Sequence, residues 1–142
     1  MRAQTARLLN PIPPGTRVVY TDGSTLNNGC VNARAGCGIH FPSLNNKHQD
    51  ISARLPGHAQ TNNRAEIYAI ILDLKHTTNH LPASRLLVRS DSALCVKGIN
   101  EYLVDWEFLR WSNMRGGGLA NVGLWKIVST QLKICVKWDG RW

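Results

Sequence analysis

The spacing of hydrophobic residues changes near residue 60 of this 142-residue chain. Before that point, short apolar and β-branched segments at 17–21, 35–41 and 51–55 are separated by turn-forming residues, which predicts three antiparallel strands. After it, residues 62–76 (NNRAEIYAIILDLKH) are apolar on most sides, which predicts a buried helix with an Asn as its N-cap. We therefore expect a strand-rich first half and a helix-rich second half.

Further elements follow in the second half of the chain. Residues 85–89 (RLLVR) predict a fourth strand, and Ser90-Asp91-Ser92 is a natural start for a second helix. Residues 121–132 predict another helix with Asn121 as its cap, and 133–138 (KICVKW) alternate strictly, which predicts a fifth strand. The class is α/β, with helices packed on a mixed five-stranded sheet in which three antiparallel strands precede alternating helices and strands.

No linker or repeat divides the chain, so we expect one domain over residues 17–142 behind a flexible Pro-rich lead-in at 1–16. A chain of this length buries enough surface to fold without metal or disulfide staples. With 17 Lys and Arg against 9 Asp and Glu, its formal charge is +8, which indicates a polyanionic partner. The longest apolar run, 67–74, is too short to span a membrane, so we expect no membrane partner.

The four cysteines indicate the compartment. Cys30, Cys37, Cys95 and Cys135 match neither a redox motif nor a zinc-finger spacing, so we interpret them as free thiols in a reducing environment. We therefore expect an intracellular protein of the cytoplasm or nucleus. The acid-free N-terminus with its two arginines leaves a mitochondrial transit peptide as the alternative.

Three of the nine acidic residues stand where a carboxylate is costly. Asp22 and Asp91 each follow directly on an apolar strand, and Glu66 lies in the first turns of a largely apolar helix. If the strands before Asp22 and Asp91 are adjacent and parallel, the three side chains share one crevice. Oxygen ligands from separate elements suit Mg²⁺ or Mn²⁺ rather than zinc, which predicts a metal-dependent phosphodiester hydrolase.

Each of these residues also has an ordinary structural interpretation. Asp91 between two serines is a favoured helix N-cap, and Asp22-Gly23-Ser24 is a common turn. Glu66 is a favourable charge in the first turns of a helix. Only their joint occurrence favours a metal site.

The motifs around the three acids occur in a characteristic order. They are YTDGS at 20–24, TNNRAE at 61–66, SDS at 90–92 and NVGLW at 121–125. Over about residues 18–138 the sequence resembles type 1 ribonuclease H. The resemblance implies a ribonuclease H fold and a metal-dependent endonuclease that cuts the RNA strand of an RNA/DNA hybrid, leaving 5′-phosphate ends.

The resemblance also implies roles for individual residues. Asp22, Glu66 and Asp91 would be catalytic carboxylates that hold Mg²⁺ or Mn²⁺ beside the Gly23 carbonyl. The implied substrate-binding residues are Thr61 and Asn121 at a DNA phosphate, Ser24, Asn28, Asn62 and Asn63 in the minor groove, and Trp106 and Trp111 near the DNA strand. From composition alone, Trp106 and Trp111 are equally well core residues, whereas we expect Trp125 and Trp138 in the core.

The end of the sequence departs from the family pattern. The resemblance implies a His-bearing glycine loop and a helix with a fourth catalytic Asp after the fifth strand, whereas only four residues follow Trp138. Asp139 comes too soon after the strand to take that role. We therefore expect a domain that lacks the C-terminal helix and keeps one of two metal sites.

Two functions remain open at this point. One is an RNA/DNA-hybrid-specific endoribonuclease that acts as a monomer. The alternative is a catalytically impaired or silent module that binds the same hybrid. A further carboxylate within reach of the metal would favour the enzyme, and the spacing near the C-terminus provides none.

Overall fold

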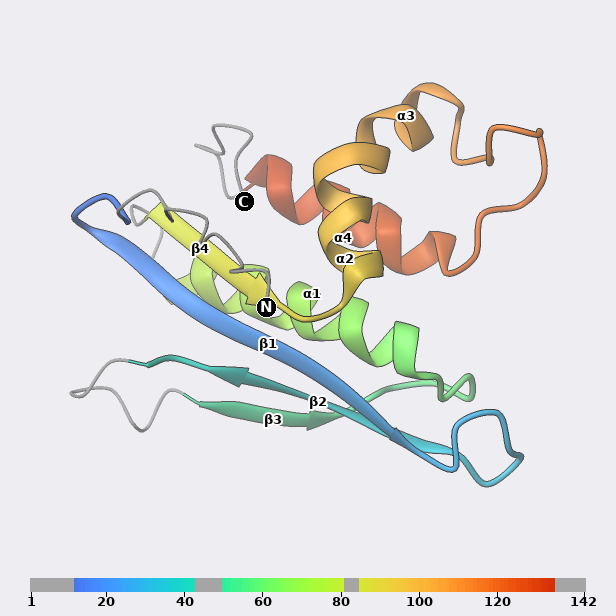
Figure 1. Ribbon diagram of the computed structural model, residues 1–142, viewed down its shortest axis with the longest axis horizontal. Coiled ribbons are helices and arrows are strands. Elements are labelled where there is room, and N and C mark those ends of the chain that lie inside the picture. The colour runs from blue at the N-terminus through green and yellow to red at the C-terminus, as the bar shows by residue number, and fades with distance from the viewer. Residues whose placement is uncertain (1–11, 43–49, 81–84, 135–142) are drawn as a thin grey trace, which may run out of the picture.

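A computed structural model describes residues 12–42, 50–80 and 85–134. One mixed sheet has the strand order β3-β2-β1-β4. Its strands are β1 (Thr16–Leu26), β2 (Arg34–His40), β3 (Ile51–Arg54) and β4 (Arg85–Ser90). Pairing is antiparallel between β1 and β2 and between β2 and β3, and parallel between β1 and β4 (Figure 1). This arrangement confirms the predicted three antiparallel strands, and the parallel pairing of β4 with β1 meets the condition set for a crevice shared by Asp22 and Asp91.

Helices cover one face of this sheet. They are α1 (Asn62–His80), α2 (Ala93–Lys97), the π-helical segment η2 (Gly98–Tyr102), α3 (Leu103–Phe108) and α4 (Val122–Ile134). α1 runs alongside β1, contacts β1 and β2, and packs against α4 on its other side (Figure 1). Within the described residues, no helix is both long and apolar enough to cross a membrane.

The predicted fifth strand is wrong for the described part of the chain, where the sheet has four strands. Lys133 and Ile134, which begin the predicted strand, form the end of α4. Residues 135–138 lie outside the described residues, as do Asp139 and the first eleven residues of the lead-in. A short alternating segment does not distinguish a strand from the last turn of an amphipathic helix, which explains the difference.

β1 continues through the segment that was interpreted as a turn. Asp22 and Ser24 pair with Gly38 and Gly36 of β2, and the strand ends only at Leu26. The Asp-Gly-Ser sequence has turn propensity, but pairing with β2 on one side and packing against α1 override it. Because β1 extends beyond the end of β4, its second half has a neighbour on one side only.

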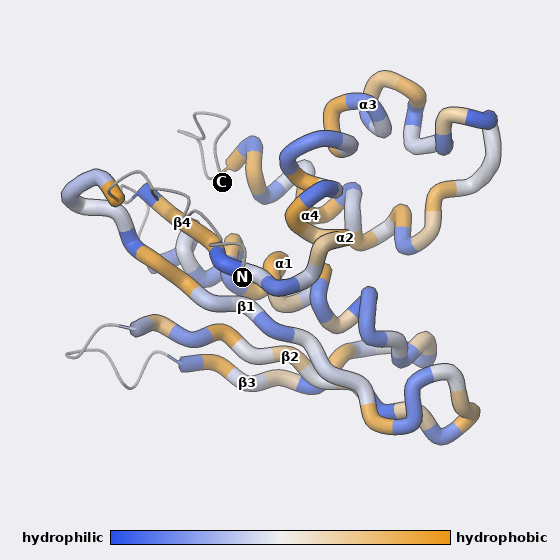
Figure 2. The backbone as a smooth tube through the Cα atoms, in the orientation of Figure 1, coloured by the Kyte–Doolittle hydropathy of each residue, from blue (hydrophilic) through white to orange (hydrophobic). Residues whose placement is uncertain are grey.

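One part of the core lies between the helices, and the rest lies between the sheet and α1. Trp125 is buried among residues of α1, α2, η2 and α4, as predicted, while Trp138 lies outside the described residues. A Cβ on Gly98 would lie 2.5 Å from the Trp125 ring, so this glycine lets the ring approach η2. Between the sheet and α1, Val19, Ile39 and Phe41 form another cluster, against which Leu72 of α1 packs. Figure 2 shows the hydrophobic stretch of β4 beside that of β1.

Candidate active site

The end of the short strand β4 sets the position of the site. β1 and β4 run parallel, and their last residue pair is Thr21 with Ser90. Asp22 and Asp91 each follow this last pair directly, so they lie next to each other at the carboxyl end of the parallel pair. The condition for a shared crevice is therefore met, at the carboxyl ends of strands where α/β sheets bind ligands.

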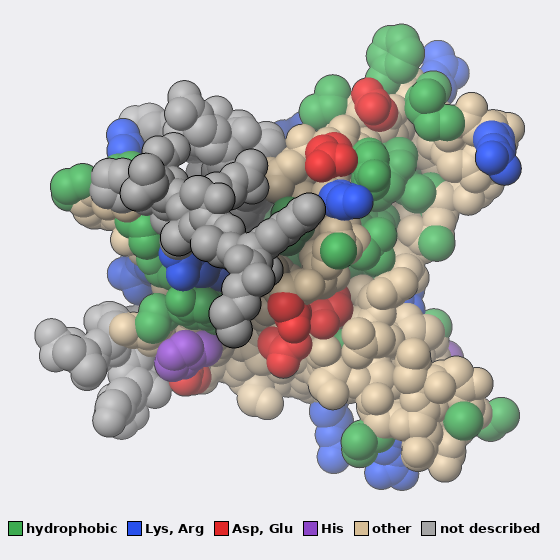
Figure 3. Space-filling view, viewed as in Figure 1, with side chains coloured by type: hydrophobic (Ala, Val, Ile, Leu, Met, Phe, Trp, Pro, Cys, Tyr) green, Lys and Arg blue, Asp and Glu red, His purple; other side chains and the backbone are tan. Residues whose placement is uncertain are grey.

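Glu66 reaches the same point from α1. One carboxylate oxygen of each of Asp22, Glu66 and Asp91 lies within 4.8 Å of the others. Asp22 and Asp91 are exposed, whereas Glu66 is only 5% exposed. The space-filling view shows acidic side chains gathered near the centre of one face, with Lys and Arg side chains along the lower edge of that face (Figure 3). The three predicted carboxylates thus form one group.

Gly23 allows α1 to come this close. A Cβ at this position would lie 2.3 Å from the backbone nitrogen of Glu66 and 2.5 Å from the carbonyl carbon of Ala65. Both atoms belong to the helix backbone and have no freedom to move aside. Gly23 is therefore a packing requirement of the site, a role that the sequence interpretation did not assign to it.

The environment of Glu66 raises the pKa of its carboxyl group to about 7. Burial is the main cause, because it removes the charged form from water, and the negative charges of Asp22 and Asp91 add to it. A hydrogen bond from the Gly23 backbone N–H acts in the opposite direction. Three carboxylates in this arrangement repel one another, so a bound cation would stabilise all three.

The donor set fits a hard divalent cation. Glu66 Oε2 is buried and has no hydrogen-bond partner among the described residues, which leaves a ligand atom free. All three side chains offer oxygen, the donor that Mg²⁺ and Mn²⁺ prefer. The described residues therefore form an acidic cluster suited to a metal ion.

The caps of the two neighbouring helices differ from the prediction and leave the acids free. Ser92, rather than Asp91, caps α2, since its Oγ accepts a hydrogen bond of 3.2 Å from the Cys95 N–H. Thr61, rather than Asn62, caps α1, since its Oγ1 accepts from the Arg64 N–H at 3.3 Å. The ordinary N-cap interpretation of Asp91 is therefore wrong.

Most of the predicted substrate-binding residues gather around the start of α1. Asn28, in the turn after β1, accepts a hydrogen bond of 3.4 Å from the Asn62 N–H. Asn121 accepts one of 3.5 Å from Arg64 Nη1. Thr61 and Asn63 are exposed in the same turn, and Ser24 follows Asp22 along β1 with its side chain exposed. Their contacts with substrate stay predictions.

Asn121 and Arg64 form a link between α4 and α1. Asn121 has a left-handed backbone (φ 57°), which Asn tolerates better than most residues, and its carbonyl accepts the first helical hydrogen bonds of α4. Arg64 lies in the first turn of α1. The sequence interpretation missed Arg64, because an Arg in an exposed first turn carries no signal of a tertiary partner.

Trp106 and Trp111 are half-buried, so the structure supports part of each interpretation. The Trp106 ring lies 5.1 Å from the Trp125 ring, centroid to centroid, and packs against the helical core. Trp111 packs on the same core and has Lys126 Nζ 5.9 Å from its ring centroid. Both residues are partly accessible, and Trp111 lies beside this cationic side chain.

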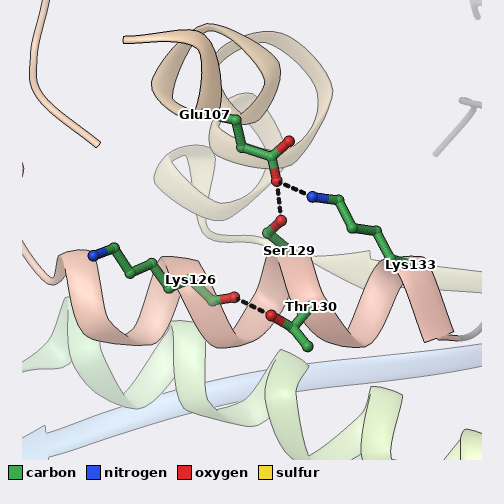
Figure 4. A network of polar contacts seen from close by, with 5 residues as sticks. All are labelled: Glu107, Lys126, Ser129, Thr130 and Lys133. Carbon is green, nitrogen blue, oxygen red and sulfur yellow. Dashed lines mark hydrogen bonds and ion pairs between the residues drawn. The ribbon is translucent and has the colours of Figure 1, made fainter. Parts of the chain in front are cut away.

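A polar network fixes the helix that carries Trp106. The Glu107 carboxylate of α3 accepts hydrogen bonds from the buried Ser129 hydroxyl and from Lys133 Nζ of α4, the latter at 2.8 Å (Figure 4). These two donors lower the pKa of Glu107. The sequence interpretation missed this network, since its members are far apart in the chain.

Comparison with known proteins identifies the family. The RNase H family profile matches residues 14–139, and the chain belongs to this family. Ribonuclease H of Schizosaccharomyces pombe is 45% identical over 91 residues, which cover 64% of this chain and 32% of that protein. Human ribonuclease H1 is 30% identical over 123 residues, covering 80% and 42% respectively. These matches thus cover less than half the length of either relative.

Solved structures support the same fold. A foamy viral protease-reverse transcriptase in complex with dsDNA aligns with a TM-score of 0.72 at 26% identity, over 89% of this chain and 79% of that one. The solution structure of the PFV RNase H domain aligns with a TM-score of 0.66 at 25% identity, over 83% and 72%. The described chain therefore has an α/β RNase H-like fold with a four-stranded sheet.

Proposed function

We propose that this chain is an endoribonuclease that hydrolyses the RNA strand of RNA/DNA hybrids. The observation that carries the proposal is the convergence of Asp22, Glu66 and Asp91 within 4.8 Å. Membership of the RNase H family and the relatives named ribonuclease H support it. The products would carry 5′-phosphate ends.

The side chains around the start of α1 suit a nucleic-acid hybrid. Hybrids are recognised by shape, by phosphates and by RNA 2′-hydroxyl groups, for which hydroxyl and amide side chains are appropriate donors and acceptors. Thr61, Asn62, Asn63 and Asn28 provide such groups close to the acidic cluster. Asn121 provides another, held by Arg64. These residues would orient the RNA strand so that one phosphate lies at the acids.

We propose Mg²⁺ or Mn²⁺ as the cofactor. Asp22, Glu66 and Asp91 would hold it, with the Gly23 carbonyl as a further candidate ligand. When bound, such an ion stabilises charge on the attacked phosphate and lowers the pKa of a coordinated water. The protein contributes the ligand geometry and, through burial of Glu66, a carboxylate that gives up its proton when the cation binds.

The test is cleavage of an end-labelled RNA strand in an RNA/DNA hybrid by the purified 142-residue chain. Reactions would contain Mg²⁺ or Mn²⁺, with single-stranded RNA and duplex RNA in parallel. Asp22→Asn is the control for contaminating host enzyme. We expect cleavage of the hybrid alone, with 5′-phosphate products, and none by the control. An intact hybrid in the presence of folded wild-type chain would contradict the enzyme proposal.

A hybrid-binding module without cleavage is the second candidate. It is favoured by the three-membered carboxylate group in the described residues, because two-metal hydrolysis in this family uses a fourth. Binding of the hybrid by folded protein without cleavage in either metal would support it. For both candidates we propose a monomeric, intracellular protein with an RNA/DNA hybrid as its partner.

A further inference from the structure

The face of β1, β2 and β3 opposite α1 has an unusual surface. Side chains alternate between the two faces of a sheet, and residues paired across neighbouring strands point to the same face. Residues paired with the exposed Asp22 therefore lie on the same face of the sheet as Asp22. One such row is Asp22, Gly38 and Ser52, and the next is Ser24, Gly36 and Arg54. The central strand therefore presents two glycines on this face.

These glycines create a groove. A groove of about 780 Å³ extends over this face, with Asp22 and Ser24 among its lining residues on β1 and Arg54 on β3. Neither Gly36 nor Gly38 has a positive φ, and a Cβ on Gly38 would meet no atom closer than 3.8 Å. Backbone conformation and packing thus do not require glycine at position 38. What its glycine provides is an open floor next to the acidic cluster.

The far end of the groove is positively charged. Arg34 and Arg54 line it, both are exposed, and neither takes part in an ion pair within residues 12–42, 50–80 and 85–134. From the strand spacing and the rise per residue, the Cα atoms of Asp22 and Arg54 are about 12 Å apart. A chain of negative charges that starts at the acidic cluster reaches these arginines after a short distance.

We propose that this groove binds the ribose-phosphate backbone of the RNA strand on one side of the phosphate held at the acidic cluster. The inference rests on the proposed function and extends it by one subsite. Arg34 and Arg54 would bind successive phosphates, an interaction that guanidinium groups make with two parallel hydrogen bonds. Ser24 and Ser52 flank the glycine floor and offer hydroxyls to the 2′-hydroxyls that distinguish RNA.

The groove follows directly from Asp22, and this favours the RNA strand over the DNA strand. The nucleic-acid strand whose phosphate lies at the acidic cluster continues into the groove without bending, and in the proposed function that strand is the RNA. The flat glycine floor leaves room for a sugar-phosphate chain, whereas β-branched side chains typical of an exposed strand would obstruct it.

The experiment measures binding with the Asp22→Asn chain, which keeps the hybrid intact. Hybrids have one fixed, labelled DNA strand, and their RNA strands are shortened one nucleotide at a time from either end. Fluorescence anisotropy then gives the dissociation constant for each length. The variants are Arg34→Gln, Arg54→Gln and both together. Arg85→Gln is the matched control, since it removes one exposed arginine at the first residue of β4, the opposite end of the sheet.

We expect the double variant to bind long hybrids about tenfold more weakly at low salt, the loss of one charge-assisted contact or more. For the double variant, the slope of log K against log salt concentration should be shallower by about one to two units. Both effects should vanish once the RNA is shortened past the groove from one end. Arg85→Gln should resemble the parent chain.

Two results would overturn the inference while leaving the proposed function intact. One is wild-type cleavage of the hybrid together with unchanged affinity of the double variant at every RNA length. The other is an affinity loss in the double variant that stays the same however far the RNA strand is shortened from either end, because the arginines would then contact the DNA strand. If the wild-type chain neither cleaves nor binds the hybrid, the proposed function itself fails, and the inference with it.

Gly38→Thr separates a structural role from a ligand-binding role. A β-branched residue in a strand should leave the melting temperature unchanged or raise it. The same residue should narrow the groove and weaken binding of long hybrids more than of short ones. Equal binding of all lengths by a well-folded Gly38→Thr variant would contradict the proposed subsite.

Discussion

The start and the middle of α1 each contain a buried carboxylate, and the two differ in what surrounds them. Glu66 is 5% exposed and Asp73 is fully buried, and the pKa of each is raised to about 7. Asp22 and Asp91 lie beside Glu66, whereas the polar contact of Asp73 is the Thr77 hydroxyl at 3.4 Å. Burial by itself therefore produces a perturbed pKa. A candidate catalytic site also needs further carboxylates from other elements.

The largest expected difference between the two carboxylates is in catalysis. Glu66→Gln should lower the rate of hybrid cleavage by about 10³-fold or more, because metal-assisted charge stabilisation is worth several kcal/mol. Asp73→Asn, the matched neutral substitution on the same helix, should stay within a few-fold of wild type. Single-turnover cleavage of end-labelled hybrid measures both. Equal losses in the two variants would show that Glu66 acts through the stability of α1 alone.

The second expected difference is in cation-dependent stability. A cation at 100 times its dissociation constant should stabilise the wild-type fold by about 2.7 kcal/mol. Asp73→Asn should show the same increase in melting temperature with Mg²⁺ or Mn²⁺, and Glu66→Gln should show little. Thermal melts with and without the ion, at constant ionic strength, measure this. An undiminished increase in Glu66→Gln would place the cation elsewhere on the chain.

Gly23 and Gly98 provide a third comparison, because each lies where a larger side chain would collide with a neighbour. A Cβ at Gly23 would strike the backbone of α1, and one at Gly98 would strike the Trp125 ring. Each alanine variant should lose about 2 kcal/mol of unfolding free energy from overpacking. Gly23→Ala alone should also weaken cation binding, since it displaces Glu66. Denaturant unfolding gives the first quantity and Mn²⁺ titration the second, and weakened Mn²⁺ binding in Gly98→Ala would contradict the distinction.

The smallest expected effect concerns pH. The pKa of Asp73 is about 7 in the folded chain against an ordinary 3.8, mainly because of burial. Between about pH 4 and 7 the folded state therefore binds more protons than the unfolded state. The stabilisation that comes from this tighter proton binding is complete below pH 4 and is lost as the pH rises through 7. Relative to Asp73→Asn, the wild-type melting temperature should fall by about 3 °C or more between pH 5 and pH 8. Parallel pH profiles of the two proteins would refute the assignment.

Much of this comparison could be predicted from the sequence, because local chemistry encodes it. Asp22 and Asp91 stand directly after apolar segments, and Glu66 interrupts an apolar helix. Those signals located the acids, and the capping and periodicity signals located α1, β2, β3, β4 and α4 to within a few residues. The perturbed pKa of Asp73 had no such signal, since its cause is burial by distant elements.

The errors of prediction come from local signals that leave more than one outcome open. The turn propensity of Asp22-Gly23-Ser24 is overridden by pairing with β2 and packing against α1. At Asp91 the adjacent Ser92 is the cap instead, and the short alternating segment from Lys133 fits the last turn of a helix as well as a strand. The groove of Arg34 and Arg54 was missed for the converse reason. An isolated arginine on an alternating strand looks like solvated surface until the register places it beside glycine.

The parallel pairing of β1 with β4 has a kinetic consequence. Asp22, Glu66 and Asp91 come from distant parts of the chain, and they meet only after this non-local pairing and the docking of α1 are complete. Contacts of that kind form late, because loop closure must precede them. A cation held by all three should therefore slow unfolding and leave the refolding rate nearly unchanged. The appearance of cation binding during refolding would then mark the last step of folding.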